Sequence, residues 1–404
     1  MRVKKSNIIS LINIVLIIIL IVFTRVLDNE IVLISMLTLI GLLVIVQLIL
    51  HTMLFEKLLL VYLIVLSYFM KVIYSILTLD EFYFKDSIKY KHEIKIITNS
   101  NMNIDEIINF IGSIQFGYHI IASFLYKIAD IDYILVLINI VLSIISSILF
   151  YLIVKKDFGD KVALFTLIFS LFSTNILLFS SHILKDVTVL FFISFSLYLY
   201  KNNKTLFAII IAILLIPIRI YAGIAIILGI IGDILIKKEI SGFRKFLLIF
   251  ITFVIGLFTL SQPISQYFIS NISSFLSSYN TIDILISPFD TIFKFYFSPL
   301  LWNYSSIDNI YTILLLDSFV MLLLGISLFM FIFKIVIDKT LRSTIIIYFI
   351  PVLVHAVALG LEYGGSSDRQ RVGVYFILIM FIGIGILYKK TTNLEYKKIE
   401  FETE

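Results

Sequence analysis

The residues with the clearest capacity for chemistry lie in a short acidic and aromatic segment, 79–90, at the end of an apolar run. Its carboxylates are Asp80, Glu81 and Asp86. Charge beside hydrocarbon is expensive to keep without a use, so these carboxylates are candidates for binding a polar substrate or a cation. A carboxylate within hydrogen-bond reach of a hydroxyl can also take its proton. The alternative for each of them is a solvated loop that flanks the apolar run.

Cationic and polar residues recur in other short segments between apolar runs. These are 180–186 with Lys185 and Asp186, 217–221 with Arg219 and Tyr221, 298–302 with Trp302, and 362–371 with Arg369 and Arg371. Arginine suits phosphate because its planar fork matches pairs of oxygens, and cations stabilise a departing phosphate. Beside a carboxylate base, such residues would suit a sugar hydroxyl and a phosphate that is anchored in lipid. Trp302 is more typical of an interfacial anchor.

The charged residues also have purely structural interpretations. Lys185 and Asp186 could form a local pair in which Asp186 caps the following helix, since Asp is a preferred N-cap residue. Arg219 could extend its charged end to the membrane interface. Arg369 and Arg371 could be compensated by acidic residues of their own loop. These alternatives stay open at the level of sequence.

The elements that must position these residues are apolar helices. The 404 residues are 60% hydrophobic and 15% charged, with a mean hydropathy of +1.09. Apolar runs recur at lengths near the ~20 residues that cross a bilayer. The sequence therefore predicts an all-α, polytopic membrane protein, with residues 1–404 as a single transmembrane domain.

We predict about twelve spans. Their approximate bounds are 8–24, 31–52, 57–78, 132–154, 162–180, 187–200, 205–218, 221–236, 246–261, 311–337, 343–361 and 372–388. The first is expected to be retained, since no small-residue cleavage site follows Thr24.

Basic residues concentrate in alternate loops, which places both termini inside because positive loops stay cytoplasmic. The tail 389–404 is then cytoplasmic, and the two long loops 79–131 and 262–310 lie outside. All the candidate residues above fall on the outer side. The chain is rich in Ile and Lys, which favours a bacterial cytoplasmic membrane as its location.

Both long outer loops contain apolar residues at helical spacing. In the first they are Ile104, Ile107, Ile108 and Ile111, followed by the stretch 116–128; in the second they are Phe268, Ile272, Phe275 and Tyr279. Such patterns predict amphipathic helices along the membrane surface. These helices could roof a cavity or pack on the outer ends of the spans.

Several short motifs resemble the glycosyltransferase C superfamily of bacterial polytopic membrane glycosyltransferases. Residues 86–90, the run 116–118 and Asn139 resemble its first outer loop, while 180–186 and 217–221 resemble its recurring outer turns. The resemblance covers roughly 75–225 and extends more loosely to 298–299 and 368–371. This chain departs from the usual pattern by placing three spans, where many members have one, before that loop.

The resemblance implies transfer of a sugar from a polyprenyl-phosphate carrier to an acceptor outside the cytoplasmic membrane. Carried over by position, the base is Asp86, with Asp80 and Glu81 as rivals. The implied partners are a polyprenyl-phosphate-linked sugar, a saccharide or lipid-linked acceptor and membrane lipid. The uneven charge between the two faces already accounts for the net +5, so no nucleic-acid partner is expected.

Two other functions remain possible from the sequence. An O-antigen-polymerase-type enzyme would rely on outer arginines, and the fifteen residues between Arg369 and Gly385 resemble the spacing of an arginine–glycine motif in such polymerases. A transporter of lipid-linked saccharides is the other. Transporters usually place ionisable groups near mid-bilayer, and Asp317, inside its span, is the main residue of that kind.

Metal chemistry has little support in the sequence. Cysteine is absent, which excludes disulfides and thiolate ligands, and the five histidines lack the spacing of a metal site. No metal site is predicted, although outer carboxylates could hold a divalent cation. No other cofactor is expected.

Overall fold

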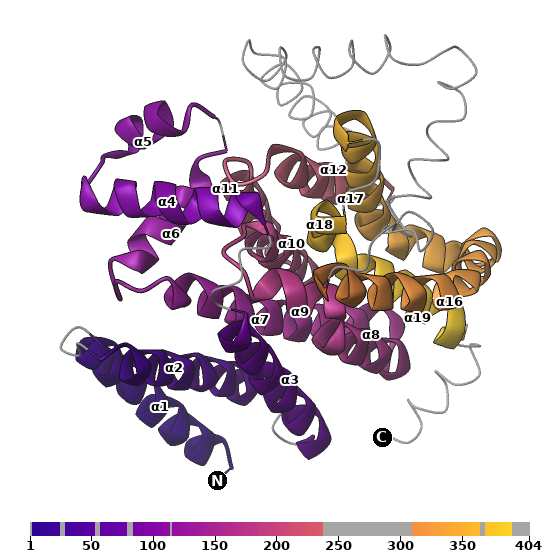
Figure 1. Cartoon of the computed structure of the whole chain (residues 1–404). Helices are drawn as coiled ribbons and strands as arrows, with labels where there is room; N and C mark the ends of the chain where they lie inside the picture. The colour runs from indigo at the N-terminus through magenta and orange to yellow at the C-terminus, as the bar shows by residue number, and fades with distance from the viewer. Residues whose placement is uncertain are drawn as a thin grey trace.

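The chain folds into helices throughout its described residues, which in this computed structural model are 2–24, 29–52, 57–78, 84–113, 115–236, 309–363 and 368–389. No strand occurs in these ranges (Figure 1), so the all-α prediction is confirmed. The helices that precede the first gap of more than a few residues are α1 (Arg2–Thr24), α2 (Glu30–His51), α3 (Leu58–Leu77), α4 (Lys85–Asn99), α5 (Ile104–Ile111), α6 (Gly117–Tyr126), α7 (Tyr133–Phe158), α8 (Asp160–Phe172), α9 (Thr174–Ser180), α10 (Asp186–Lys201), α11 (Thr205–Leu215) and α12 (Ile220–Ile236). Those that follow it are α16 (Asn309–Ile337), α17 (Lys339–Tyr363), α18 (Asp368–Arg371), the 3-10 turn η3 (Val372–Val374) and α19 (Tyr375–Leu387).

Four helices in the described ranges are long and apolar enough to cross a membrane, or up to six if each bent pair counts as one span. Shorter apolar helices include α11, α12 and the stretch from Val372 to Leu387. Helices coincide with every predicted span except 246–261, which lies outside the described residues together with the loop 262–308. The number of twelve stays a prediction.

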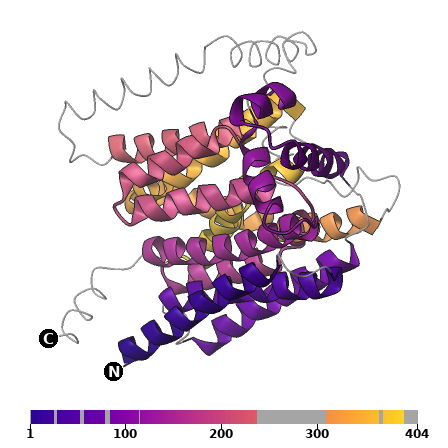
Figure 2. The ribbon, with the colours of Figure 1, turned by 90° about the vertical axis from the view of Figure 1, so that its left-hand side faces the viewer.

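The centre of the bundle is α7. Its most apolar window is 83% buried by other helices, against 22% for α2, although both are nearly uniformly apolar. A helix that is apolar on all sides needs apolar surroundings on all sides, and protein supplies them for α7. Seen from the side, the helices form a stack of near-parallel rods with the indigo α1 and α2 at the bottom (Figure 2).

One predicted span is broken. The sequence suggests a continuous helix over 162–180, but α8 and α9 meet at a 48° bend. Ser173 sits at the break with extended backbone, and its hydroxyl accepts a hydrogen bond from the backbone N–H of Ile176 at 3.3 Å. Serine favours such caps over helix interiors because its hydroxyl competes for backbone groups. The break therefore has a local cause.

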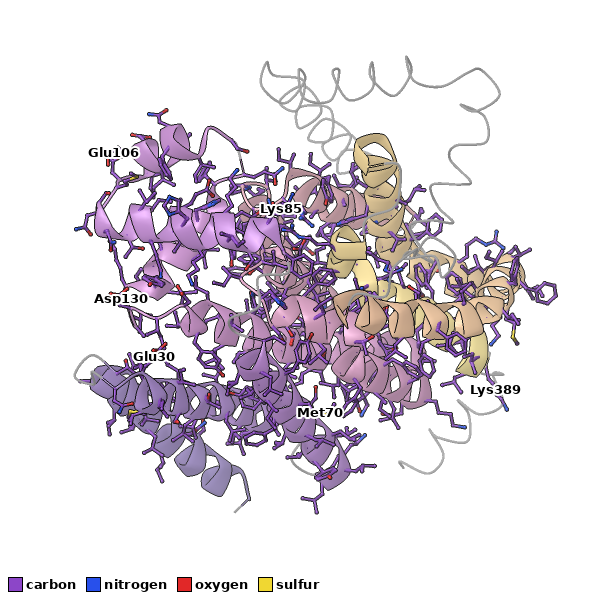
Figure 3. The ribbon with its side chains drawn as sticks, viewed as in Figure 1. Glu30, Met70, Lys85, Glu106, Asp130 and Lys389 are labelled. Carbon is purple, nitrogen blue, oxygen red and sulfur yellow. The ribbon has the colours of Figure 1, made fainter. Side chains whose placement is uncertain are left out.

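Three shorter helices, α4, α5 and α6, lie in the segment 79–131 that the sequence predicts to be the first outer loop. The predicted helices over 104–111 and 116–128 are confirmed as α5 and α6, and α5 begins with a capping box between Asn103 and Glu106. The sequence reading missed α4, whose buried residues Tyr90, Ile94 and Ile97 recur at helical spacing between charged ones. Figure 3 shows Glu106 with these helices on the left and Lys389 far from them on the right.

Candidate functional site

Ion pairs from four distant segments meet beside the start of α4. The Arg369 Nε donates to the Asp186 Oδ2 at 2.6 Å, and the Arg219 Nη1 lies 2.9 Å from the Asp186 Oδ1. The Arg369 Nη1 also donates to the Asp86 carboxylate. We call Asp86, Lys185, Asp186, Arg219 and Arg369 the outer cluster. All five were candidates from the sequence, and the structure brings them together.

The turn that carries Lys185 and Asp186 is held by Asn139 of α7. The Asn139 side-chain amide donates to the carbonyl oxygens of His182 and Leu184, each at 2.9 Å. Asn139 is fully enclosed, so these bonds satisfy a buried amide and fix the approach to α10 at the same time. Asp186 is thereby placed at the first residue of α10.

The capping interpretation of Asp186 is wrong. Lys185 occupies the N-cap position of α10, and no side chain caps the helix there. The carboxylate of Asp186 is completely buried; it accepts a hydrogen bond from Arg369 and forms an ion pair with Arg219. Asp186 is therefore the anchor that holds both guanidinium groups in place.

Arg219 is positioned by the turn between α11 and α12. Pro217 has no N–H and cannot continue α11, so the chain turns there. The backbone N–H of Gly117, at the start of α6, donates to the Pro217 carbonyl at 2.9 Å. A Cβ on Gly117 would lie 3.0 Å from the Pro217 carbonyl carbon, which is tighter than most such contacts, so the close approach favours glycine. The motifs 116–118 and 217–221 are thus packed against each other.

Tyr221 supports Arg219 from the same turn. The Arg219 guanidinium lies over the Tyr221 ring at 5.6 Å from its centroid. Tyr221 in turn packs against His355 of α17, whose ring meets the Tyr221 ring edge-on at a centroid distance of 5.1 Å. The predicted role of Tyr221 as a direct substrate contact remains a prediction; in the structure its ring contacts Arg219 and His355.

Exposure increases across the outer cluster from Asp186 to Asp86. The Asp186 side chain is 0% exposed, that of Arg369 is 19% exposed, and that of Asp86 is 51% exposed. A ligand that approaches from outside would therefore meet Asp86 and Arg369 before the other members. Asp86 lies in the first turn of α4, where a carboxylate is favoured by the helix dipole.

Burial and charge set the protonation of the inner members of this cluster. Burial alone would raise the pKa of Asp186, but Arg369 and Arg219 outweigh it and hold that pKa below its usual range. Burial, helped by the neighbouring Arg219, lowers the pKa of Lys185 to about 7. The Lys185 ammonium donates to the side-chain oxygen of Gln115. Lys185 is therefore a cation that a modest pH change can neutralise.

Three residues at the site were missed as candidates from the sequence: Gln115, Tyr90 and Tyr118. The rings of Tyr90 and Tyr118 lie 5.3 Å apart, and both side chains are buried. Burial raises the pKa of Tyr90, although Arg369 opposes that shift. One available signal was spacing, since Tyr90 follows Asp86 by four residues and shares its face of α4.

Arg371 belongs to a second network, away from Asp186. Its Nη2 lies 3.1 Å from the Asp317 Oδ2, and the Tyr375 hydroxyl and the Ser173 hydroxyl also donate to that carboxylate. Arg371 is 0% exposed. Asp317, the ionisable residue that the sequence placed inside a span, is thus paired. The rival bases Asp80 and Glu81, and also Trp302, lie outside the described residues.

The described residues contain no group of three or more His, Asp or Glu side chains arranged to hold a metal ion. Both carboxylates of the outer cluster are engaged by arginines instead. With Lys185 protonated, three cations face two carboxylates, and the surplus positive charge suits an anion. Planar guanidinium groups arranged around one point favour a phosphate.

Comparison with known proteins adds no relative. No family model matches the chain, and it matches neither a curated protein nor a solved structure.

Proposed function

We propose that the protein is a membrane glycosyltransferase that moves a sugar from a polyprenyl-phosphate-linked donor to an acceptor on the outer face of the cytoplasmic membrane. The observation that carries this proposal is the arrangement of Arg369 between the exposed Asp86 and the buried Asp186. It pairs a carboxylate that can reach solvent with fixed cations that can hold phosphate.

In this mechanism Arg369, Arg219 and Lys185 bind the phosphate of the donor and stabilise the charge it gains as it leaves. Asp186 does not contact substrate; it orients the two arginines. When phosphate takes over the outer face of Arg369, Asp86 is released from its ion pair and can act as a base.

In this transfer, one bond to the anomeric carbon breaks and one forms. The bond between the anomeric carbon and the phosphate oxygen breaks, and its electron pair stays on the phosphate. The acceptor oxygen forms the new bond to the anomeric carbon, and its proton passes to Asp86. No metal or redox cofactor is needed for this balance.

A second candidate is a repeat-unit polymerase of the O-antigen type, acting on the same face. The observation that favours it is that two arginines, and not a pair of carboxylates, lie at the centre of the cluster. Its donor would be a lipid diphosphate oligosaccharide, whereas the first proposal expects a lipid monophosphate sugar. The chemical identity of the bound lipid separates the two.

The test is sugar transfer in membranes that contain the protein and its lipid-linked substrates, measured for Asp86→Asn, Arg219→Ala and Arg369→Ala. We expect all three to lose activity. Activity that survives in Asp86→Asn but disappears in Asp80→Asn or Glu81→Gln would reassign the base. Silent carboxylate variants with inactive arginine variants would favour the polymerase.

The predicted orientation has its own test, because the chain has no native cysteine. Lys89→Cys, in the first outer loop, should react with a membrane-impermeant maleimide applied to whole cells. Lys204→Cys, in a predicted inner loop, should react only after permeabilisation. The opposite pattern would contradict the orientation on which the proposal depends.

A further inference from the structure

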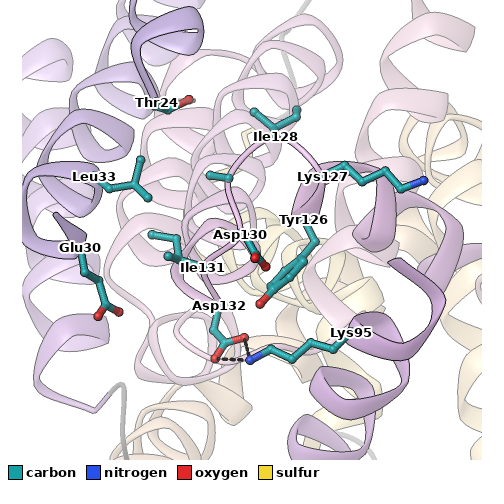
Figure 4. Close-up of a pocket in the computed structure, with 11 residues that line it drawn as sticks. Thr24, Glu30, Leu33, Lys95, Tyr126, Lys127, Ile128, Asp130, Ile131 and Asp132 are labelled. Carbon is teal, nitrogen blue, oxygen red and sulfur yellow. Dashed lines mark hydrogen bonds and ion pairs between the residues drawn. The ribbon is translucent and has the colours of Figure 1, made fainter. Parts of the chain in front are cut away.

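The described residues contain a pocket of about 650 Å³ away from the outer cluster. It lies between the start of α2, the second half of α4 and the segment 126–132 that joins α6 to α7 (Figure 4). The proposed transfer of the sugar uses none of these residues. Glu30, Asp130 and the end of α4 fall on the predicted outer side, so the pocket would open on the face where Asp86 lies.

The lining of this pocket is charged, and its carboxylates outnumber its cations. Its carboxylates are Glu30, Asp130 and Asp132, and its cations are Lys95 and Lys127. The Lys95 ammonium lies 3.1 Å from Asp132, a pair that Figure 4 shows at the pocket's lower edge. Lys91, just beyond the lining, lies 2.6 Å from the same carboxylate. The lining itself carries three carboxylates and two lysines, and the Lys127 ammonium points away from those carboxylates and donates to the Asn101 side-chain oxygen at 3.0 Å.

This excess of carboxylates distinguishes the pocket from the outer cluster, where cations exceed carboxylates. A lining rich in carboxylates repels anions and suits a neutral ligand with many hydroxyls, because each hydroxyl can donate to a carboxylate and accept from Lys95. The side chains of Leu33, Ile128 and Ile131 add an apolar wall. Sugar rings present C–H faces beside their hydroxyls and so match a mixed lining of this kind.

The two sites are joined by α4. Asp86 lies in the first turn of that helix and Lys95 nine residues later, a separation of about 14 Å along the axis. That distance is bridged by a short oligosaccharide. A saccharide held in the pocket could therefore extend along α4 and present its end to Asp86.

We propose that this pocket binds the neutral saccharide part of the acceptor, a role that rests on the proposed glycosyl transfer. Carboxylates at 30, 130 and 132 accept hydrogen bonds from sugar hydroxyls, and Lys95 donates to them. The pocket holds the acceptor chain while the outer cluster holds the donor phosphate.

The test is binding of the detergent-purified full chain to an array of neutral and uronic-acid oligosaccharides. We expect neutral oligosaccharides to bind, and the Asp130→Asn/Asp132→Asn variant to bind them at least about tenfold more weakly. Asp105→Asn, which removes an exposed acid on α5 outside this pocket, is the matched control and should bind like the unaltered protein. Binding of no neutral saccharide, or equal binding by the double variant, would overturn the proposal.

A second measurement covers the case in which the double variant fails to fold. Ile131→Cys lines the pocket and provides the only thiol of that chain, so its rate of reaction with a maleimide reports access to the pocket. The bound neutral oligosaccharide from the array should slow labelling at least about tenfold, and an unchanged rate would place it elsewhere. If oligosaccharide binding fails while the double variant still copurifies with donor lipid at the normal level, the pocket proposal fails and the proposed function does not.

Discussion

The two ends of α10 carry charged clusters of different kinds. At its start Asp186 anchors the outer cluster; at its end, about 22 Å away, Lys201 pairs with Asp157 of α7. The inner cluster consists of Lys57, Lys155, Asp157, Asp160 and Lys201. Its pairs include Lys57 with Asp160 at 3.6 Å, whose side chains are 48% and 66% exposed.

This difference shows that charge alone does not identify a site in this protein. Exposed pairs such as Lys57–Asp160 are screened by solvent and contribute about 0–1 kcal/mol. Asp186 is buried and fixes two arginines in one geometry, which preorganises them for an anion. We therefore propose that the outer cluster holds an anionic ligand, whereas the exposed pairs of the inner cluster lie in the basic loops that are predicted to set the orientation.

The largest expected effect is that of Arg369→Ala on sugar transfer. The variant removes the guanidinium that joins Asp86 to Asp186, and preorganised charge of this kind is worth about 10²–10³-fold in rate. Arg342→Ala is the matched control, since Arg342 is exposed and donates to backbone carbonyls of Ile335 and Val336. Transfer assays in membranes with equal protein levels measure both. Comparable activity in the two variants would remove the distinction between the ends of the molecule.

Arg371→Ala should damage folding instead of substrate affinity. Removing one partner of a buried ion pair leaves Asp317 uncompensated, at a cost of about 3–5 kcal/mol. Detergent-solubilised protein should unfold at a lower temperature and elute as aggregate on size exclusion. The fraction of Arg371→Ala that does fold should keep normal affinity for substrate, because the structure gives Arg369 and Arg371 separate roles. Normal stability with lost affinity would move Arg371 into the binding site.

Lys185 should make donor binding sensitive to pH. Its pKa lies near 7 in the free protein, so it is a cation below that pH and neutral above it. Affinity for the lipid phosphate is expected to fall as pH rises through the neutral range, and a bound anion shifts the midpoint upward. Lys185→Arg keeps the charge and should flatten the profile between pH 6 and 9, roughly the window set by that pKa. An identical profile for this variant would assign the titration to another group.

The smallest effect is expected at the inner cluster. Asp160→Asn removes the exposed partner of Lys57 and Lys155, so the free energy of unfolding should change by no more than about 1 kcal/mol. Transfer activity should be unchanged at equal protein level. A loss of activity as large as that of Arg369→Ala would mean that both ends of α10 take part in the function.

The sequence predicts the helices and the members of the outer cluster because both can be recognised from short stretches of the chain. Apolar runs of sufficient length predict helices, and basic loops predict that the charged segments share one side. The ion-pair partners of a charged residue, by contrast, come from segments that are distant in the sequence. Asp186 could cap α10 from the sequence alone, and only the approach of α18 and of the 217–221 turn gives it two arginines.

The other features that the sequence did not predict have the same origin. Arg369 and Arg371 are two residues apart and so face different directions on a helical turn, which sends one to Asp186 and the other to Asp317. The helix α4 was missed because its exposed face is charged, so its mean hydropathy is low and only the spacing of Tyr90, Ile94 and Ile97 signals it. The α8–α9 bend occurs at Ser173, whose hydroxyl caps α9.

The central claim is that the outer cluster holds a phosphate that is attached to a lipid. Mass spectrometry of lipids that copurify with the protein tests it most directly, with Arg219→Ala, Arg369→Ala and Arg342→Ala purified in parallel. We predict a polyprenyl-phosphate-linked saccharide with the unaltered protein and with Arg342→Ala, and at least about tenfold less with the other two variants. Absence of such a lipid from the unaltered protein, or its equal recovery with Arg369→Ala, would contradict the claim.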